Sequence, residues 1–428
     1  MRAKGSVVQL VGLVIEALLQ GVRIGELCYI KSQDKSRIYP AEVVGFKARR
    51  VLLMPLADVQ GIGAGCEVIA TNRLVSVKVG PKLLGRVVDG IGNAMDGKGP
   101  IIADDVYPLD NAPPNPIRRA RITNIMPTGV RAIDGFLTFG EGQRMGLFAG
   151  SGVGKSTLLG MIARNAKADI NVLCLVGERG REVNEFIEDS MGEEGMARSV
   201  VVCATSDMSS LLRMKAPMTA SAIAEYFRDQ GKKVFLMMDS VTRFAMAQRE
   251  VGLAIGEPPS TKGYTPSVFA TLPRLLERAG MSDKGSITAL YTVLVEGGDM
   301  EDPIADAVRG ILDGHIVMDR KIASQGIYPA IDVLPSVSRL ITALVPKEHY
   351  NAQMEVRKLM ANFRDVQDML MIGAYVKGSN PDYDDAIARY PQVKEFCAQR
   401  IDDPTAFEDA VKTIQFLGAK ASAFGGLG

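Results

Sequence analysis

Apolar residues in the first eighty positions form short runs that Gly, Pro and Asp separate. These runs cover residues 7–15, 25–30, 41–46, 51–55, 67–70 and 74–79. Several short strands at such even spacing favour a closed antiparallel sheet. The pattern therefore predicts a small β-barrel over residues 1–79, which we expect to serve oligomerisation.

The pattern changes from about residue 140, where apolar strands alternate with helical stretches. The expected strands cover residues 144–148, 171–176, 200–204, 234–238, 286–294 and 315–318. Such alternation is typical of a mostly parallel sheet that helices cover. We assign this α/β core to residues 80–345. Its first part, 80–127, is rich in Gly and Pro and predicts a linker region.

Helical patterns replace the strands after residue 344. Two stretches, 354–371 and 404–421, have helical character, so residues 346–428 are predicted to form a helical C-terminal domain. The expected fold class is thus α/β, with a small barrel before the core and helices after it.

Composition narrows the choice of function. The 428 residues carry a formal net charge of +1, which gives no reason to expect a polyanionic partner. Tyr29, Tyr39 and Phe46 are the few aromatic residues of the predicted barrel, whereas a barrel that binds single strands needs stacking rings beside a basic groove. The scattered cysteines have no zinc or disulfide spacing. No signal peptide or membrane-length apolar run is present, which predicts a cytoplasmic protein.

Residues 149–157 read Ala-Gly-Ser-Gly-Val-Gly-Lys-Ser-Thr, between an apolar strand and a predicted helix. This is a phosphate-binding loop, in which backbone N–H groups and a helix N-terminus converge on phosphate oxygens. Lys155 can reach the outer phosphates, and the Ser156 hydroxyl can ligate Mg²⁺. The residues expected to hold ATP here are Gly150, Ser151, Gly152, Val153, Gly154, Lys155, Ser156 and Thr157.

Two further strand ends carry candidate chemistry. Asp239 follows the apolar strand at 234–238, the position of a carboxylate that holds Mg²⁺ through water. Residues 177–182, Gly-Glu-Arg-Gly-Arg-Glu, follow the strand at 171–176. A carboxylate at that sheet edge can polarise an attacking water. The hexapeptide alone is equally compatible with a solvated, charged turn.

Together these motifs resemble the rotary ATP synthase superfamily, and most closely its type III protein secretion ATPases, flagellar or injectisome. The resemblance rests on residues 148–157, 177–182, 238–244, 256–264, 266–269, 275–280, 313–317, 328–332 and 336–339. It implies a RecA-like P-loop core that uses ATP and Mg²⁺.

The resemblance also implies roles for single residues. Glu178 matches the carboxylate that activates water, and Arg179 matches its polar companion near the γ-phosphate. Asp239 matches the carboxylate on the magnesium side, and Arg243 matches a further active-site arginine.

Two more matches concern the nucleotide base and the assembly. Tyr328 matches an aromatic residue that packs on adenine. Arg339 matches an arginine finger that enters the neighbouring subunit's site, so the resemblance implies a homohexamer. In contrast, His315 is expected to be a structural strand residue and His349 an exposed one.

The function implied is ATP hydrolysis that energises type III protein export, releasing chaperones from export substrates and unfolding them. Implied partners are those chaperones and secreted substrates, a regulator and stalk-like proteins of the export apparatus, and the inner-membrane export gate. The protein would work at the cytoplasmic face of that membrane. An amphipathic helix often precedes the barrel in this family, whereas only residues 1–5 precede the first apolar run here. The alternatives are a hexameric nucleic-acid translocase, which the composition disfavours, and a non-catalytic nucleotide-binding ring subunit.

Overall fold

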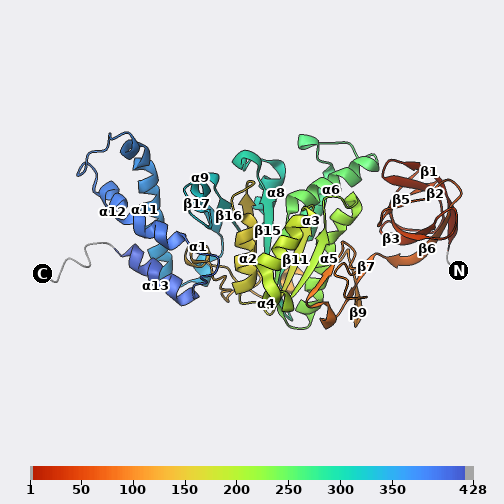
Figure 1. Ribbon diagram of the computed structural model, residues 1–428, viewed down its shortest axis with the longest axis horizontal. Helices are drawn as coiled ribbons and strands as arrows, with labels where there is room; N and C mark the ends of the chain where they lie inside the picture. The colour runs from red at the N-terminus through yellow and green to blue at the C-terminus, as the bar shows by residue number, and fades with distance from the viewer. Residues whose placement is uncertain (1–2, 420–428) are drawn as a thin grey trace.

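The computed structural model describes residues 3–419. They form an elongated molecule in which a barrel, an α/β core and a helical domain follow one another along the long axis (Figure 1). This order confirms the α/β architecture that the sequence predicts.

The N-terminal strands close into a barrel in the order β1–β2–β5–β4–β3–β6. Its strands are β1 (Lys4–Val11), β2 (Val14–Leu18), β3 (Glu26–Lys31), β4 (Ile38–Lys47), β5 (Arg50–Pro55) and β6 (Glu67–Leu74). Burial alternates along β3, where Cys28 and Ile30 face the barrel interior. The apolar run at 7–15 is not one strand, because a turn at Gly12, with φ of 58°, divides it into β1 and β2.

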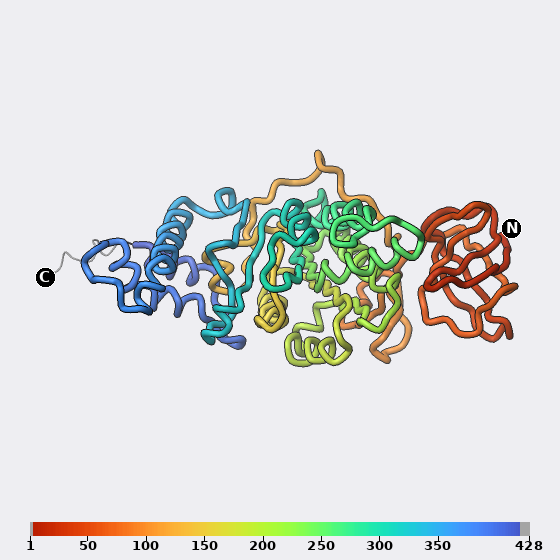
Figure 2. Tube along the Cα trace, turned by 90° about the horizontal axis from the view of Figure 1, so that it is seen from above, coloured from red at the N-terminus to blue at the C-terminus, as the bar shows by residue number. Residues whose placement is uncertain are grey.

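The segment predicted as a linker contributes structure of its own. Strand β9 (Asp105–Pro108) of this segment pairs with β7 (Ser76–Val79), and β8 (Arg86–Val88) joins the edge of the central sheet beside β12. Residues 76–79, predicted as part of a barrel strand, therefore lie outside the closed barrel. Residues 109–124 then run as an extended strap along the outside of the core (Figure 2).

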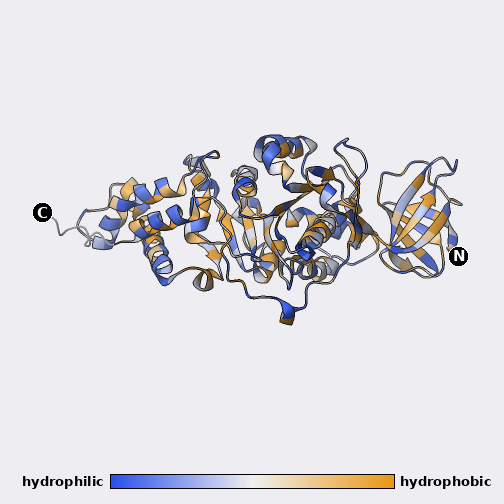
Figure 3. Ribbon diagram, turned by 90° about the horizontal axis from the view of Figure 1, so that it is seen from below, coloured by the Kyte–Doolittle hydropathy of each residue, from blue (hydrophilic) through white to orange (hydrophobic). Residues whose placement is uncertain are grey.

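The central sheet runs in the order β17–β16–β10–β15–β13–β11–β12–β8, with β14 beside β15. The strands not yet bounded are β10 (Arg144–Ala149), β11 (Ile170–Val176), β12 (Ser199–Ala204), β13 (Lys233–Asp239), β14 (Gly280–Met281), β15 (Ser286–Leu294), β16 (Gly314–Met318) and β17 (Ile331–Ser338). Pairing from β16 to β8 is parallel. Every residue of β11 is buried, because helices cover both faces of the sheet. Figure 3 shows these strands as apolar ribbons inside a more polar shell.

Helices of the core fill both faces and the sheet edges. They are α1 (Arg131–Phe136), α2 (Lys155–Asn165), α3 (Gly180–Glu185), α4 (Gly192–Ala197), α5 (Ser210–Asp229), α6 (Val241–Ala254), α7 (Pro266–Leu276), α8 (Pro303–Ile311), α9 (Arg320–Ser324) and α10 (Ile341–Leu344), with a π-helical segment η3 (Phe186–Met191). The longest of them, α5, starts where the Ser209 side chain accepts the Leu212 N–H, a standard N-cap.

The C-terminal domain consists of α11 (Lys347–Met371), α12 (Pro381–Cys397) and α13 (Phe407–Gly418). The predicted helix at 404–421 is thus shorter, and its last two residues lie outside the described part of the chain. None of the helices within residues 3–419 has both the length and the apolar character needed to cross a bilayer.

The two histidines differ from each other in their surroundings. His315 lies in β16, as predicted. The prediction that His349 is exposed is wrong, since it is 1% exposed and its Nε2 lies 2.8 Å from the Gly135 carbonyl oxygen. The reason is tertiary: the first turns of α11 pack against the core, which a polar helical pattern does not reveal.

Candidate active site

The phosphate loop connects β10 to α2. Parallel neighbours β15 and β16 fix β10 on both sides. Gly152 and Gly154 have φ of 78° and 85°, a region that residues with a side chain rarely adopt. Gly154 immediately precedes α2, so the loop directs backbone N–H groups and the positive end of the helix dipole at one point.

Three charged side chains meet beside this loop. The Lys155 Nζ donates a hydrogen bond to Asp239 Oδ1 and lies 3.7 Å from Glu178 Oε1. Asp239 ends β13 and is 5% exposed, and the Thr292 hydroxyl donates to the same Oδ1 at 2.7 Å. Because β10, β11 and β13 are parallel, their carboxyl ends bring these residues to one sheet edge.

Glu178 follows β11 after Gly177, whose φ is 70°. Its carbonyl oxygen accepts the Ser206 N–H at 3.0 Å, which anchors the turn. Burial, as the largest cause, and the charge of Asp239 together raise the pKa of the Glu178 carboxyl to about 7, although the charge of Lys155 lowers it. A carboxyl with a pKa near neutrality is suited to accept a proton from water.

Arg243 lies directly against the Glu178 turn. A Cβ at position 177 would be 3.2 Å from the Arg243 Cβ, Cγ and Cδ, so glycine there leaves room for the arginine. Among the described residues, the buried Arg243 Nε has no hydrogen-bond partner. This N–H is therefore available to a ligand in the site.

Arg179 is not part of this cluster. Its side chain is 81% exposed and forms an ion pair with Glu182 at 3.5 Å. Although Arg179 is next to Glu178 in sequence, the structure directs it to solvent.

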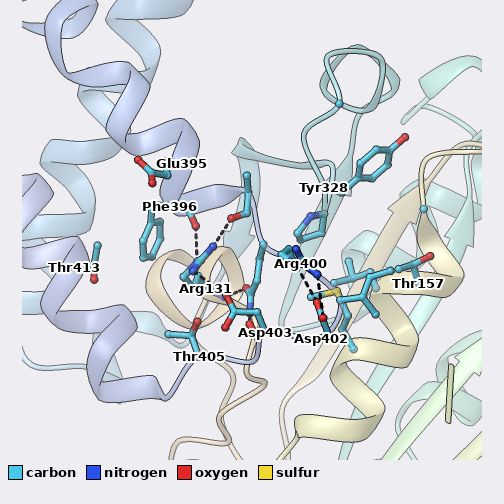
Figure 4. A pocket seen from close by; sticks show the side chains of 18 of the residues that line it. Arg131, Thr157, Tyr328, Glu395, Phe396, Arg400, Asp402, Asp403, Thr405 and Thr413 are labelled. Atoms are coloured by element: carbon cyan, nitrogen blue, oxygen red, sulfur yellow. Dashed lines mark hydrogen bonds and ion pairs between the residues drawn. The ribbon is translucent and has the colours of Figure 1, made fainter. Parts of the chain in front are cut away.

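Tyr328 lies at the mouth of the loop. Its Cδ1 would be 3.3 Å from a Cβ at Gly154, and the residue is 46% exposed. A cavity of about 1420 Å³ opens beside it, between the phosphate loop and the helical domain (Figure 4).

Sequence reasoning did not find the far side of this cavity. Arg131 and Phe396 line it, together with Gln399 and the following residues to Asp403. Figure 4 shows Phe396 and Tyr328 on different sides of the space. No local motif marks these residues, because they meet only when the segment after α12 packs on the core.

Arg339 lies far from the phosphate loop of its own chain. It follows β17, whose Ser338 pairs with Gly314, whereas Ala149 pairs with Met318 at the opposite end of β16. Four strand residues, at about 3.3 Å each, separate the two ends by about 13 Å. Arg339 is exposed and donates to the Arg309 carbonyl oxygen at 3.1 Å.

The loop and the end of β13 fit a magnesium ion. No group of three or more His, Cys, Asp or Glu side chains within residues 3–419 could hold a metal alone. Mg²⁺ commonly takes one or two protein oxygens, with phosphate oxygens and waters completing the shell. The Ser156 hydroxyl and the Asp239 carboxylate supply such oxygens.

Comparison with known proteins gives the family. Residues 129–338 match the nucleotide-binding domain of the ATP synthase alpha/beta family, residues 7–72 match its beta-barrel domain, and residues 345–415 match the T3SS EscN ATPase C-terminal domain. The flagellum-specific ATP synthase of Bacillus subtilis (strain 168) is 52% identical over 96% of this chain and 94% of its own length. The chain belongs to the flagellar and type III secretion ATPases of the ATP synthase alpha/beta family.

Relatives named for the flagellum and for type 3 secretion both belong to this family, and two of the solved structures that match are of a type III secretion ATPase. The type 3 secretion system ATPase of Xanthomonas euvesicatoria is 51% identical over 96% of this chain and 93% of that protein. The assembled ATPase EscN from the enteropathogenic E. coli type III secretion system superposes with a TM-score of 0.92 at 46% identity, over 97% of this chain and 100% of that one. A second EscN structure, in complex with its central stalk EscO, gives 0.89 at 45% identity and the same coverage.

Membership confirms the predicted class of enzyme. The chain is an ATPase of this family, which uses ATP with Mg²⁺. The nucleic-acid translocase and the non-catalytic ring subunit find no support among these relatives.

Proposed function

We propose that this chain hydrolyses ATP at sites shared between neighbouring subunits of a homohexameric ring, and that hydrolysis energises type III protein export. The observation that carries the proposal is the Lys155–Glu178–Asp239 cluster beside the phosphate loop, with Arg339 at the opposite edge of the sheet. We retain residues 1–79, 80–345 and 346–428 as the ring-forming barrel, the ATPase core and the helical domain.

Each half of the site has a distinct task. Lys155 exchanges its two carboxylate partners for the outer phosphates of ATP, and Glu178 then faces water rather than an ammonium group. Glu178 accepts the proton of that water, and the free Arg243 Nε donates to the γ-phosphate side. Ser156 and Asp239 would hold Mg²⁺, which would offset phosphate charge when bound. Arg179 assists Glu178 only after the ion pair between Arg179 and Glu182 has broken.

Arg339 completes the site of the adjacent subunit. About 13 Å along β16 separates the strand end before Arg339 from the strand end before its own phosphate loop, so Arg339 does not line the site of its own chain. An arginine supplied in trans stabilises charge on the transferred phosphoryl group. Ring assembly would therefore be a condition of turnover.

The export role extends from the relatives to this chain. Relatives named for the flagellum and for type 3 secretion match over nearly the whole length, and EscN is seen with a central stalk. We propose that this ATPase likewise engages a stalk-like protein and a regulator, and works at the cytoplasmic face of the inner membrane beside an export gate. There it releases chaperones from export substrates and unfolds those substrates.

Specific activity as a function of protein concentration tests the shared site. We expect ATP turnover per subunit to rise steeply as purified protein passes from dilute monomer to ring, because only rings place Arg339 in a neighbour's site. Turnover that stays constant down to monomer would contradict it. Single-stranded RNA should give no salt-sensitive stimulation.

A further inference from the structure

One residue, Gln399, joins three segments that border the nucleotide cavity through its side chain and its backbone N–H. Its Nε2 donates to the carbonyl oxygens of Gly129 and Asp403, both at 2.8 Å. Its Oε1 accepts the Arg131 N–H at 2.8 Å. The Gln399 backbone N–H donates to the Tyr328 carbonyl oxygen, also at 2.8 Å. The loop before α1, the Tyr328 loop and the segment after α12 thus share one buried anchor.

The Gln399 side chain is buried, and its amide hydrogens are all used in hydrogen bonds. Gln399 is 6% exposed, and both hydrogens of its amide group are used. The Arg131 Nε donates to the Phe396 carbonyl oxygen at 3.0 Å, which adds a second tie between the same segments. Phe396 packs on α1, where a Cβ at Gly135 would be 3.0 Å from its Cζ. The position of Phe396 relative to Tyr328 therefore depends on these polar ties.

We propose that Gln399 is a positioning residue that fixes the spacing of Tyr328 and Phe396 across the cavity and so sets the affinity for the nucleotide. This inference rests on the proposed function and on the role that the family resemblance implies for Tyr328, which is to pack on the adenine base. The hydrogen bonds of Gln399 go to backbone atoms outside the phosphate loop. Its loss should weaken nucleotide binding and leave the hydrolytic step unchanged.

Gln399→Leu keeps the volume but removes three side-chain hydrogen bonds. We expect KM for ATP and the Kd for ADP to rise by a common factor on the order of tenfold, with kcat within about twofold of wild type. Gln353→Leu is the matched control, because Gln353 is buried at 2% in the same domain, does not line the cavity, and has an Oε1 without a partner among the described residues. It should leave KM and the Kd unchanged.

Gln399→Glu tests the donor role separately. A carboxylate has no hydrogen to offer the Gly129 and Asp403 carbonyl oxygens, whereas a protonated carboxyl has one. Burial raises a carboxyl pKa, so the Kd of Gln399→Glu for ADP, relative to wild type, should improve as pH falls from about 8 to about 6. Gln399→Leu should show no such improvement. A general loss of packing could not produce this difference between the two variants.

Titration with fluorescent ADP, at protein concentrations at which rings form, tests the role of Gln399. If folded Gln399→Leu binds ADP within about twofold of wild type, or loses kcat at unchanged KM, the proposal is wrong. If that variant does not fold, a wild-type, pH-independent affinity of Gln399→Glu overturns it. The active-site proposal fails by a different result, which is hydrolysis of ATP by Lys155→Ala. The two proposals can therefore be tested separately.

Discussion

Lys155 lies between two carboxylates, and at the residue scale we propose that this arrangement links nucleotide binding to catalysis. Asp239 and Glu178 offset its charge, so a phosphate that attracts Lys155 also changes the surroundings of both acids. The three residues are adjacent in space because three parallel strands end together.

Lys155→Ala should abolish turnover. Removing a cation that acts on developing phosphate charge costs on the order of a hundredfold or more in kcat, and nucleotide binding should weaken as well. Steady-state phosphate release measures the effect. Lys167→Ala is the control, since Lys167 is exposed just beyond the other end of α2; equal activity of both variants would remove Lys155 from the site.

The raised pKa of Glu178 predicts a pH profile. Glu178 acts as a base only when deprotonated, and its pKa is raised to about 7, so kcat should fall as pH drops below that value and level off above it. Glu178→Gln should bind ATP, scarcely cleave it, and lose this acidic limb from its residual rate. Glu185→Gln, an exposed position on α3, should keep the wild-type profile. Rapid turnover by Glu178→Gln would exclude it as the base.

Local motifs made one half of the site predictable. Residues 149–157 and Asp239 carry their signal within a few positions of a strand end, and Glu178 follows the same rule. Gln399 and Phe396 carry none, because their function depends on contacts with residues more than two hundred positions earlier, such as Gly129 and Gly135. The exposure of Arg179 could not be predicted from the sequence either, since the direction of a side chain in a turn depends on the residues packed around it.

At the scale of elements, α5 connects the barrel to the core. Lys215 on α5 and Glu42 on β4 form an ion pair at 2.6 Å, with side chains 7% and 8% exposed. Both lie where the barrel meets the core, and the second oxygen of Glu42 has no partner among the described residues. We expect the pair to fix the barrel's orientation more than it adds stability.

Removing one partner of this ion pair should lower the stability of the fold strongly, whereas removing both charges should lower it much less. Lys215→Met leaves a buried carboxylate unpaired and should lower the free energy of unfolding by about 3 kcal/mol. Adding Glu42→Gln should restore much of that loss. Urea unfolding followed by circular dichroism measures both. Lys4→Met, which breaks a surface pair with Glu67, should leave the midpoint unchanged; additive effects at 42 and 215 would refute the coupling.

Helices and strands with a strong hydrophobic periodicity were predictable from the sequence. Elements that depend on contacts with distant parts of the chain were not. The strand at 286–294 was predicted with its observed bounds as β15. Strand β8 was missed because three residues in a Gly-rich segment pair only through contact with β12. Helix α12 was missed because Pro381 and Pro391 interrupt its pattern, although Pro381 occupies its first turn, where proline is tolerated.

At the scale of the whole molecule, the proposed mechanism gives the chain half a site at each of two places. The phosphate loop lies at one edge of the central sheet, and Arg339 lies at the other. We propose that a ring of identical subunits joins these halves, since head-to-tail contacts form a ring when the rotation between neighbours closes. Exposed barrel residues such as Val11, Leu18 and Phe46 are consistent with a further contact between copies.

Complementation between two inactive variants tests this shared site most directly. Lys155→Ala keeps Arg339, and Arg339→Ala keeps the phosphate loop, so each alone should hydrolyse almost no ATP. Random one-to-one mixing before assembly should create intact interfaces at about a quarter of positions, and ATP turnover should recover toward that fraction of wild type. A mixture as inactive as its components, in rings shown to contain both variants, would contradict the account.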